Sequence, residues 1–65
     1  MSLQYDLHAI VKGTDKQTNF STMLLKVILK ADNVNRVKLA RGFPNAVRMV
    51  DEYWDSGEIL NLPYD

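Results

Sequence analysis

Hydrophobic residues recur at helical spacing most clearly between residues 20 and 31. The apolar positions follow the order i, i+3, i+4, i+7, i+8 and i+11, which places them along one side of an α-helix. They are Phe20, Met23, Leu24, Val27, Ile28 and Ala31. Leu25 and Leu29 widen this stripe, so the helix is apolar over most of its circumference. Because such a helix is usually covered by several neighbours, we expect it to be the central helix of the fold.

The start of this helix has alternative caps. Thr14 with Gln17 fits a capping box, in which each side chain satisfies the free backbone N–H of the other residue. Asn19 or Ser21 would instead cap a shorter helix. The sequence leaves this choice open.

A shorter helix is predicted next, beginning at Asp32 or Asn33 and running to about Arg41. Its apolar positions are Val34, Val37, Leu39 and Ala40. Gly42 is placed to end this helix, because glycine takes the left-handed conformation without steric cost.

A third helix is predicted to begin at Pro44, since the first helical position does not need the N–H that proline lacks. Its apolar positions are Phe43, Ala46, Val47, Val50 and Trp54. Ser56 and Gly57 close it. In the tail that follows, Ile59, Leu60 and Leu62 are expected to fold back over the helices, and Pro63 limits further regular structure.

The N-terminal segment fits two patterns. Alternating apolar residues from Leu3 to Val11 suit a half-buried strand, whose partner would be residues 58–62. The same segment matches a helix stripe, with Ser2 as its N-cap and Gly13 as its stop. We favour the helix, because an isolated two-stranded sheet is only marginally stable.

The predicted fold is a single all-α domain over residues 1–65, a three- to four-helix bundle with a short extended C-terminal tail. The alternative adds a two-stranded sheet from residues 3–12 and 58–62.

Composition narrows the function classes. The 65 residues are 46% hydrophobic, which favours a folded chain, and they include one His and no Cys. Disulfides and Cys-based zinc sites are therefore excluded, and we expect no metal and no cofactor. No apolar run approaches the roughly 18 residues that span a bilayer. With no signal peptide visible, the expected location is cytoplasmic, without a membrane partner.

The formal net charge of zero hides an uneven distribution. Between residues 26 and 48 there are six basic residues and one acidic residue, Asp32. From Asp51 to Asp65 there are five acidic residues and no basic one. These segments are either solvated helix faces that attract each other or two patches of opposite sign, one of which meets a partner.

Nucleic acid is one partner to consider, because two helices joined at Gly42 suggest a helix-turn-helix. The second of these helices carries three carboxylates against Arg48, and carboxylates are repelled by phosphates. The sequence pI of about 6.5 also differs from that of a basic nucleic-acid-binding domain. Nucleic-acid binding is therefore disfavoured. If it occurs, Arg36, Lys38 and Arg41 on the short helix are the candidates.

Candidate catalytic residues are few. His8 has Asp6 and Asp15 nearby in sequence, but no Cys nucleophile is present and the serines lie at predicted helix ends. The segment from Gly13 to Lys16 lacks the spacing and order of a phosphate-binding loop. A chain of this length also has little room for an enclosed pocket, which typically occupies about 300–1,000 Å³. We therefore predict that the protein is not an enzyme and has no small-molecule substrate.

A row of carboxylates near the C-terminus gives no metal site. Its members are Asp51, Glu52, Asp55 and Glu58. A metal cage needs ligands from several directions, and a single helix face offers only one. An exposed acidic face is the preferred interpretation.

Protein contact is the remaining class. Met49, Tyr53 and Leu25 lie off the strict stripes, and Met and aromatic residues are enriched in interface cores. A small domain also gains stability by associating with itself or with a larger protein. The candidate contact residues are Arg36, Lys38, Arg41, Met49, Tyr53 and Trp54.

One stretch also resembles a known pattern. The matching residues are Leu24 to Ile28, Ala31, Asp32, Asn35, Arg36, Leu39, Ala40, Gly42, Phe43, Pro44 and Tyr53 with Trp54. Over about residues 20–54 the chain resembles small uncharacterised bacterial proteins that are often found with phages or mobile elements of Gram-positive bacteria. The resemblance implies a bacterial or phage setting and carries no catalytic residues.

These observations together predict a small non-enzymatic accessory or adaptor protein that acts through contact with another protein or with a second copy of itself. The alternative is a nucleic-acid-associated regulator that uses the basic short helix 33–41.

Overall fold

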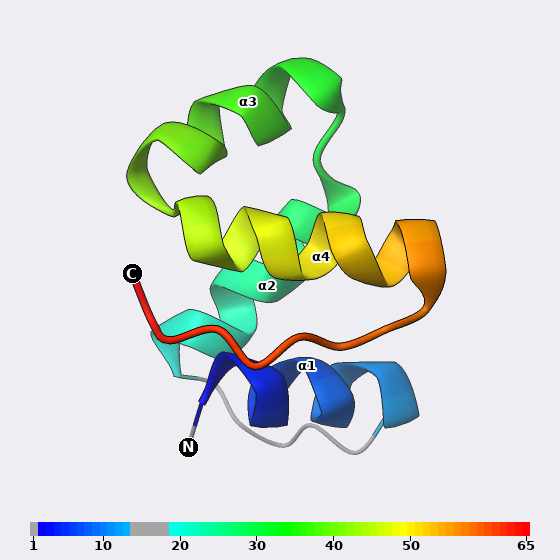
Figure 1. Ribbon diagram of the computed structural model, residues 1–65. Helices are drawn as coiled ribbons and strands as arrows, with labels where there is room; N and C mark the ends of the chain where they lie inside the picture. The colour runs from blue at the N-terminus through cyan, green and yellow to red at the C-terminus, as the bar shows by residue number, and fades with distance from the viewer. Residues whose placement is uncertain (1, 14–18) are drawn as a thin grey trace.

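Four α-helices precede an extended tail in the computed structural model, which describes residues 2–13 and 19–65. They are α1 (Leu3–Lys12), α2 (Phe20–Lys30), α3 (Asn33–Gly42) and α4 (Pro44–Ser56). Figure 1 shows α3 above α4, α1 below it and α2 behind it. No strand occurs in the described residues, so the all-α prediction is confirmed. The two-stranded alternative is wrong, because its first strand is α1.

Local hydrogen bonds explain where three of the helices begin. The side chains of Ser2, Asn19 and Asp32 accept backbone N–H groups from three residues further on, at 3.1, 2.9 and 2.8 Å. Each therefore satisfies one of the donors that a helix start leaves free. The cap at Ser2 was predicted, and Asp32 was one of the two predicted starts of the short helix. Asn19, one of the alternative caps, is the observed cap of α2. The capping box of Thr14 and Gln17 falls outside the described residues.

Glycine ends two helices in the left-handed conformation. Gly13 after α1 and Gly57 after α4 have φ angles of 74° and 75°. Gly42 was expected to act in the same way, but it is the last helical residue of α3 and has no positive φ. Phe43, with a φ of −134°, forms the junction to α4 instead.

The hydrophobic core is centred on α4, which contacts all three other helices. Its buried residues are Ala46, Val47, Met49 and Val50, and they pack with Leu3, Leu7, Leu25 and Ile28. The prediction that the helix of residues 20–31 is central is therefore wrong. That helix is more hydrophobic, but it packs against α1 and α4 only along one side.

The face that α2 buries also differs from the predicted stripe. Thr22, Leu25 and Ile28 are buried, whereas Phe20, Met23 and Val27 are exposed. A helix that is apolar over most of its surface can bury more than one face, so periodicity did not determine its orientation. The predicted apolar sides of the next helices are partly exposed as well. Val34 and Val37 on α3, and Trp54 on α4, lie at the surface.

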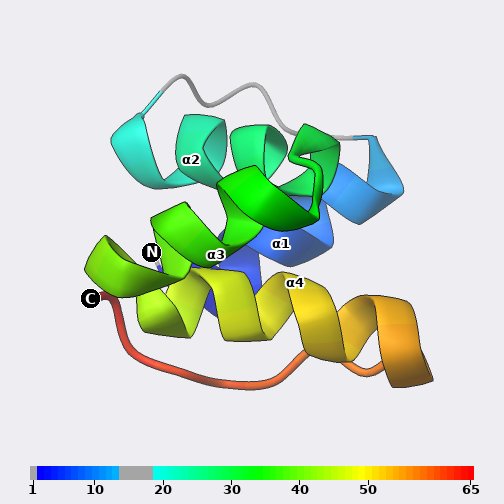
Figure 2. The same cartoon turned by 90° about the horizontal axis from the view of Figure 1, so that it is seen from above.

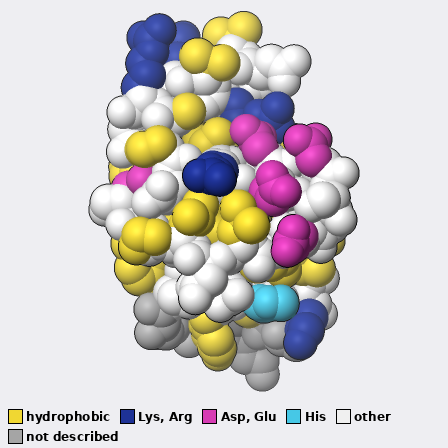
Figure 3. Space-filling view, in the orientation of Figure 1, with side chains coloured by type: hydrophobic (Ala, Val, Ile, Leu, Met, Phe, Trp, Pro, Cys, Tyr) yellow, Lys and Arg dark blue, Asp and Glu magenta, His cyan; other side chains and the backbone are white. Residues whose placement is uncertain are grey.

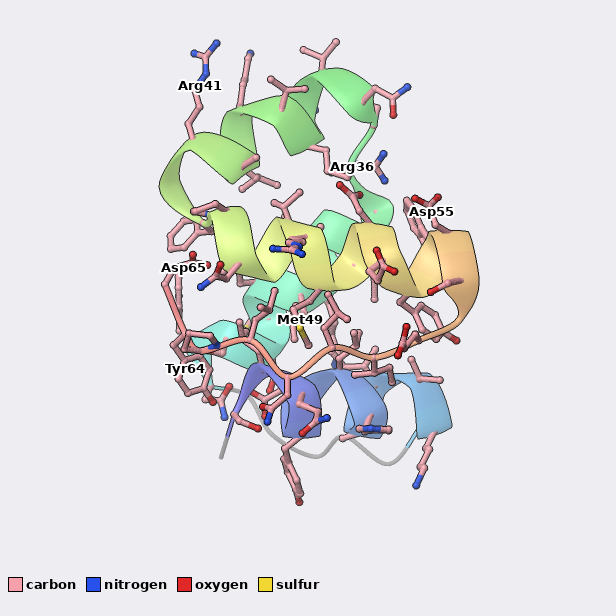
Figure 4. All side chains as sticks on the ribbon, viewed as in Figure 1. Arg36, Arg41, Met49, Asp55, Tyr64 and Asp65 are labelled. Atoms are coloured by element: carbon pink, nitrogen blue, oxygen red, sulfur yellow. The ribbon has the colours of Figure 1, made fainter. Side chains whose placement is uncertain are left out.

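The C-terminal tail packs back over the bundle, as predicted. Ile59, Leu60 and Leu62 are partly buried against the core. The carboxylate of Asp65 accepts the backbone N–H groups of Asn45 and Ala46 at 2.8 and 3.0 Å. Phe43 provides no side-chain cap for α4, so Asp65 performs this role from 20 residues away in sequence. Figure 4 shows Asp65 beside the first turn of α4.

Tyr64 joins the tail to α1. Its hydroxyl donates to Oδ2 of the buried Asp6 at 3.2 Å. Desolvation of the hydroxyl and the nearby Asp6 carboxylate raise the pKa of Tyr64 above its ordinary value. The hydroxyl therefore keeps its proton through neutral pH and remains a donor to Asp6.

The changed orientation of α2 can be tested by truncating neighbouring residues. Ile28→Ala should lower the free energy of unfolding by about 2–4 kcal/mol, because Ile28 is fully buried. Val27→Ala should change it by less than about 0.5 kcal/mol, because Val27 is exposed. Urea unfolding followed by circular dichroism measures both values. Equal losses would contradict the observed orientation.

The cap provided by Asp65 predicts a second result. Asp65→Ala should lower the free energy of unfolding by about 1 kcal/mol, because two backbone donors at the start of α4 lose their acceptor. Asp55→Ala is the matched control, since Asp55 lies near the C-terminal end of the same helix. A negative charge is unfavourable there, so this change should be neutral or slightly stabilising. Similar effects from both substitutions in urea unfolding would show that Asp65 is not a cap.

Candidate protein-contact surface

An uncovered apolar stripe runs along α2. Phe20, Met23 and Val27 are 66%, 55% and 54% exposed, and their spacing places them on one side of the helix. The ring of Phe20 lies 5.6 Å from that of Phe43, so the stripe reaches the junction between α3 and α4. Adjacent exposed apolar side chains of this size are typical of interaction sites.

A groove between α2 and α3 continues this stripe. It has a volume of about 550 Å³ and is open to solvent. Its lining residues are Val27, Lys30, Ala31, Asn35, Lys38, Leu39, Gly42 and Phe43. The groove has the volume of a small-ligand pocket, which the short chain was expected to lack, but it is not enclosed. Viewed from above in Figure 2, α3 lies over the space between α2 and α4.

The groove exists because α3 packs against α4 and makes little contact with α2. None of its residues is buried, and only two residues separate its first residue from the end of α2. Leu39 and Ala40 pack against the core as partly buried residues, and so does Phe43 just after the helix. We define the α2–α3 surface as Phe20, Met23, Val27, Ala31, Leu39 and Phe43.

Arg36 links α3 to α4. Its guanidinium carbon lies 4.9 Å from the centre of the Trp54 ring, and its Nη1 lies 3.3 Å from Oδ1 of Asp51. Its Nη2 also donates to Oδ1 of Asn33 at 3.2 Å. With its side chain only 21% exposed, Arg36 is engaged within the molecule. It therefore holds α3 against α4 and is not a free cation for an external partner.

The structure does not bring the six predicted contact residues together on one surface. Lys38 and Arg41 are exposed on α3, Tyr53 is partly buried against the core, and Trp54 is half-exposed beneath Arg36. Met49 is fully buried, so its prediction as a contact residue is wrong. Figure 4 shows Met49 between α4 and α1, whereas Arg41 points outward from the end of α3. Met49 lies inside because α4 contacts α1, α2 and α3 and therefore buries a wider face than its stripe indicated.

Exposure of Phe20, Met23 and Val27 was not predicted. All three fit the strongest apolar stripe, which favours a helix covered by its neighbours. The signal that could have identified them is the excess width of the apolar region on this helix, which exceeds what a small bundle covers.

The uneven charge distribution has a clear spatial form. In Figure 3, acidic side chains gather over the C-terminal half of α4, and basic side chains lie above them over α3. The ion pair between Arg36 and Asp51 crosses this boundary. Part of the opposite charge is therefore used within the fold, and the cations bordering the groove, Lys30 and Lys38, form no ion pair with another described residue.

The candidate catalytic groups are not assembled. Asp6 is buried and bonded to Tyr64, whereas His8 is exposed on α1, so the two do not form a pair. Asp15 lies outside the described residues. Within residues 2–13 and 19–65, no three His, Cys, Asp or Glu side chains are grouped so as to hold a metal ion. None of the helices described here has the length and apolar character needed to cross a membrane.

Comparison of the chain with protein-family models, curated proteins and solved structures finds no match. The resemblance to small bacterial and phage-associated proteins therefore stays a prediction.

The internal role of Arg36 can be tested against its neighbour Lys38. Arg36→Ala should lower the free energy of unfolding by about 1 kcal/mol, because it removes both the stacking on Trp54 and the ion pair with Asp51. It should also change the fluorescence of Trp54. Lys38→Ala, the control on the same helix, should change stability by less than about 0.5 kcal/mol. If urea unfolding showed the same loss of free energy for both substitutions, Arg36 would have no particular role in holding α3 against α4.

Proposed function

We propose that the protein is a small non-enzymatic accessory or adaptor protein that binds another protein through the α2–α3 surface. The observation that carries this proposal is the line of three large apolar side chains, Phe20, Met23 and Val27, left exposed on α2 beside an apolar groove. The resemblance adds a bacterial or phage setting, and a cytoplasmic location belongs to the same proposal.

The energetics favour a partner for this surface. Fully burying a large apolar side chain is worth about 1.5–3 kcal/mol relative to leaving it in water. Three adjacent side chains that remain more than half exposed therefore leave much of this free energy to an association. The same helix contributes Leu25 and Ile28 to the core from its other side, so the three exposed side chains lie outside the core.

Chemistry at the groove supports binding over catalysis. Its polar lining consists of two lysines and Asn35, without a carboxylate, a histidine or a hydroxyl group. General acid–base catalysis is most often carried out by His, Glu or Asp at such positions. The proposed occupant is therefore a macromolecular partner and not a substrate undergoing reaction.

The nucleic-acid alternative has less support. Lys38 and Arg41 are exposed on α3, but Arg36 is engaged with Asp51 and Trp54. The helix that would enter a DNA groove, α4, is packed between the other helices and carries the acidic surface. A duplex would leave the apolar groove uncovered.

Selection from a library of displayed helical peptides tests the proposed surface. Peptides that bind the wild-type protein should lose at least about tenfold in affinity for Val27→Glu, because a charge is placed in the centre of the apolar surface. Val11→Glu is the matched control, since Val11 is an exposed valine on α1. It should bind the same peptides as the wild-type protein.

Two outcomes would contradict the proposal. Peptides that bind Val27→Glu as well as the wild type would place the contact elsewhere, and a library without any enriched peptide would argue against a protein-binding surface. Light scattering over a concentration series tests self-association. A mass that rises from 7.5 kDa and returns to it in Val27→Glu would identify a second copy as the occupant.

A further inference from the structure

The walls of the α2–α3 groove carry charge of one sign. Lys30 projects from α2 and Lys38 from α3, and both side chains border an apolar floor that includes Leu39 and Phe43. No carboxylate lies among the lining residues. The nearest carboxylate in sequence, Asp32, is engaged with the backbone N–H of Asn35 at the start of α3. The groove therefore combines apolar contact with a positive border.

The apolar surface has the length of a short helix. Phe20 and Ala31 are 11 residues apart along α2 and its C-cap, a distance of about 16 Å at the helical rise of about 1.5 Å per residue. A helix lying in a groove of this kind presents apolar residues at i, i+3 or i+4, and i+7. About three turns of helix would cover the surface from end to end.

From this arrangement we propose that the partner binds as an amphipathic helix whose apolar face fills the α2–α3 groove and whose flanking acidic residues meet Lys30 and Lys38. The proposal rests on the proposed function and specifies its partner. Acidic flanks match the basic border, and opposite charges placed this way raise both specificity and association rate. The apolar face supplies the burial that the exposed residues of α2 lack.

A second copy of this chain fits the groove less well. In a twofold-symmetric dimer the same patch meets itself, so the interface would gather Lys30 and Lys38 of both copies with no carboxylate among the lining residues to offset their charge. The acidic helix α4 cannot serve as the occupant either. Its apolar residues are buried in the core, and only Trp54 remains half-exposed. A separate helix with acidic flanks supplies both the opposite charge and a free apolar face, and the protein stays folded when this helix binds.

Nucleic acid would interact only with the lysines of the groove and not with its apolar floor. Phosphates provide negative charge but no apolar surface to cover Val27, Leu39 and Phe43. The apolar floor of the groove therefore favours a peptide partner over a duplex.

The test is a displayed library of helical peptides in which the positions flanking a fixed apolar face are randomised. Peptides enriched on the wild-type protein should carry acidic flanks. They should lose about tenfold in affinity for Lys30→Glu/Lys38→Glu, because two attractive contacts become repulsive. Selection on this double variant should instead enrich basic flanks. Lys12→Glu, a charge reversal at the end of α1, should behave as the wild type. Circular dichroism checks that each variant is folded.

Failure of this proposal differs from failure of the proposed function. The acidic-helix proposal would be wrong if the enriched peptides had neutral flanks, or the same flanks on the wild type and on the double lysine variant. If these peptides still lost affinity for Val27→Glu, the α2–α3 surface would remain the binding site. Peptides that ignore Val27→Glu would overturn both. A dimer that dissociates in Val27→Glu would assign the groove to a second copy. Duplex DNA binding that weakens with salt and is lost in the double lysine variant, without peptide binding, would assign the lysines to phosphates. Either result would overturn the proposal.

Discussion

Packing around α4 is the interaction on which the rest of this structure depends. Ala46, Met49 and Val50 have no exposed surface, because α1, α2 and α3 pack against their helix and the returning tail covers the same core. A chain of 65 residues buries a limited fraction of its surface. The other helices therefore cover mainly one helix, the central one. The caps and the tail contacts reinforce this arrangement. Asp65 binds the start of α4, and Tyr64 holds the same tail against Asp6 on α1.

The surface of the protein follows from that choice of central helix. Since α4 takes the middle position, the more hydrophobic α2 is covered only where it meets α1 and α4. Its other side, with Phe20, Met23 and Val27, remains exposed. The neighbouring α3 has no buried residue and does not close over it. An apolar groove between α2 and α3 is the direct consequence, and the proposed contact with a partner rests on it.

The charged residues are unevenly distributed along the chain, although the net charge is zero. The basic middle of the chain and its acidic end meet where Arg36 contacts Asp51 and Trp54. This contact uses part of the opposite charge to attach α3. Lys38 lies on another side of α3 from that contact and borders the groove, together with Lys30 at the end of α2. The same helix therefore has one side that holds it in the fold and another that borders the proposed binding site.

The sequence by itself determined the helices and most of their ends. Ser2, Asp32, Gly13 and Gly57 act through backbone groups three or four residues away, so local chemistry was enough to point to each as a helix end. Tertiary structure decided which face of each helix is buried. The broad apolar surface of α2 allowed several orientations, and only packing against α1 and α4 selected Leu25 and Ile28 over Val27. Packing also placed Met49 in the core and bound Arg36 within the fold, which changed the predicted contact surface. The cap at Asp65 depends on residues 20 positions apart, a distance that no local pattern encodes.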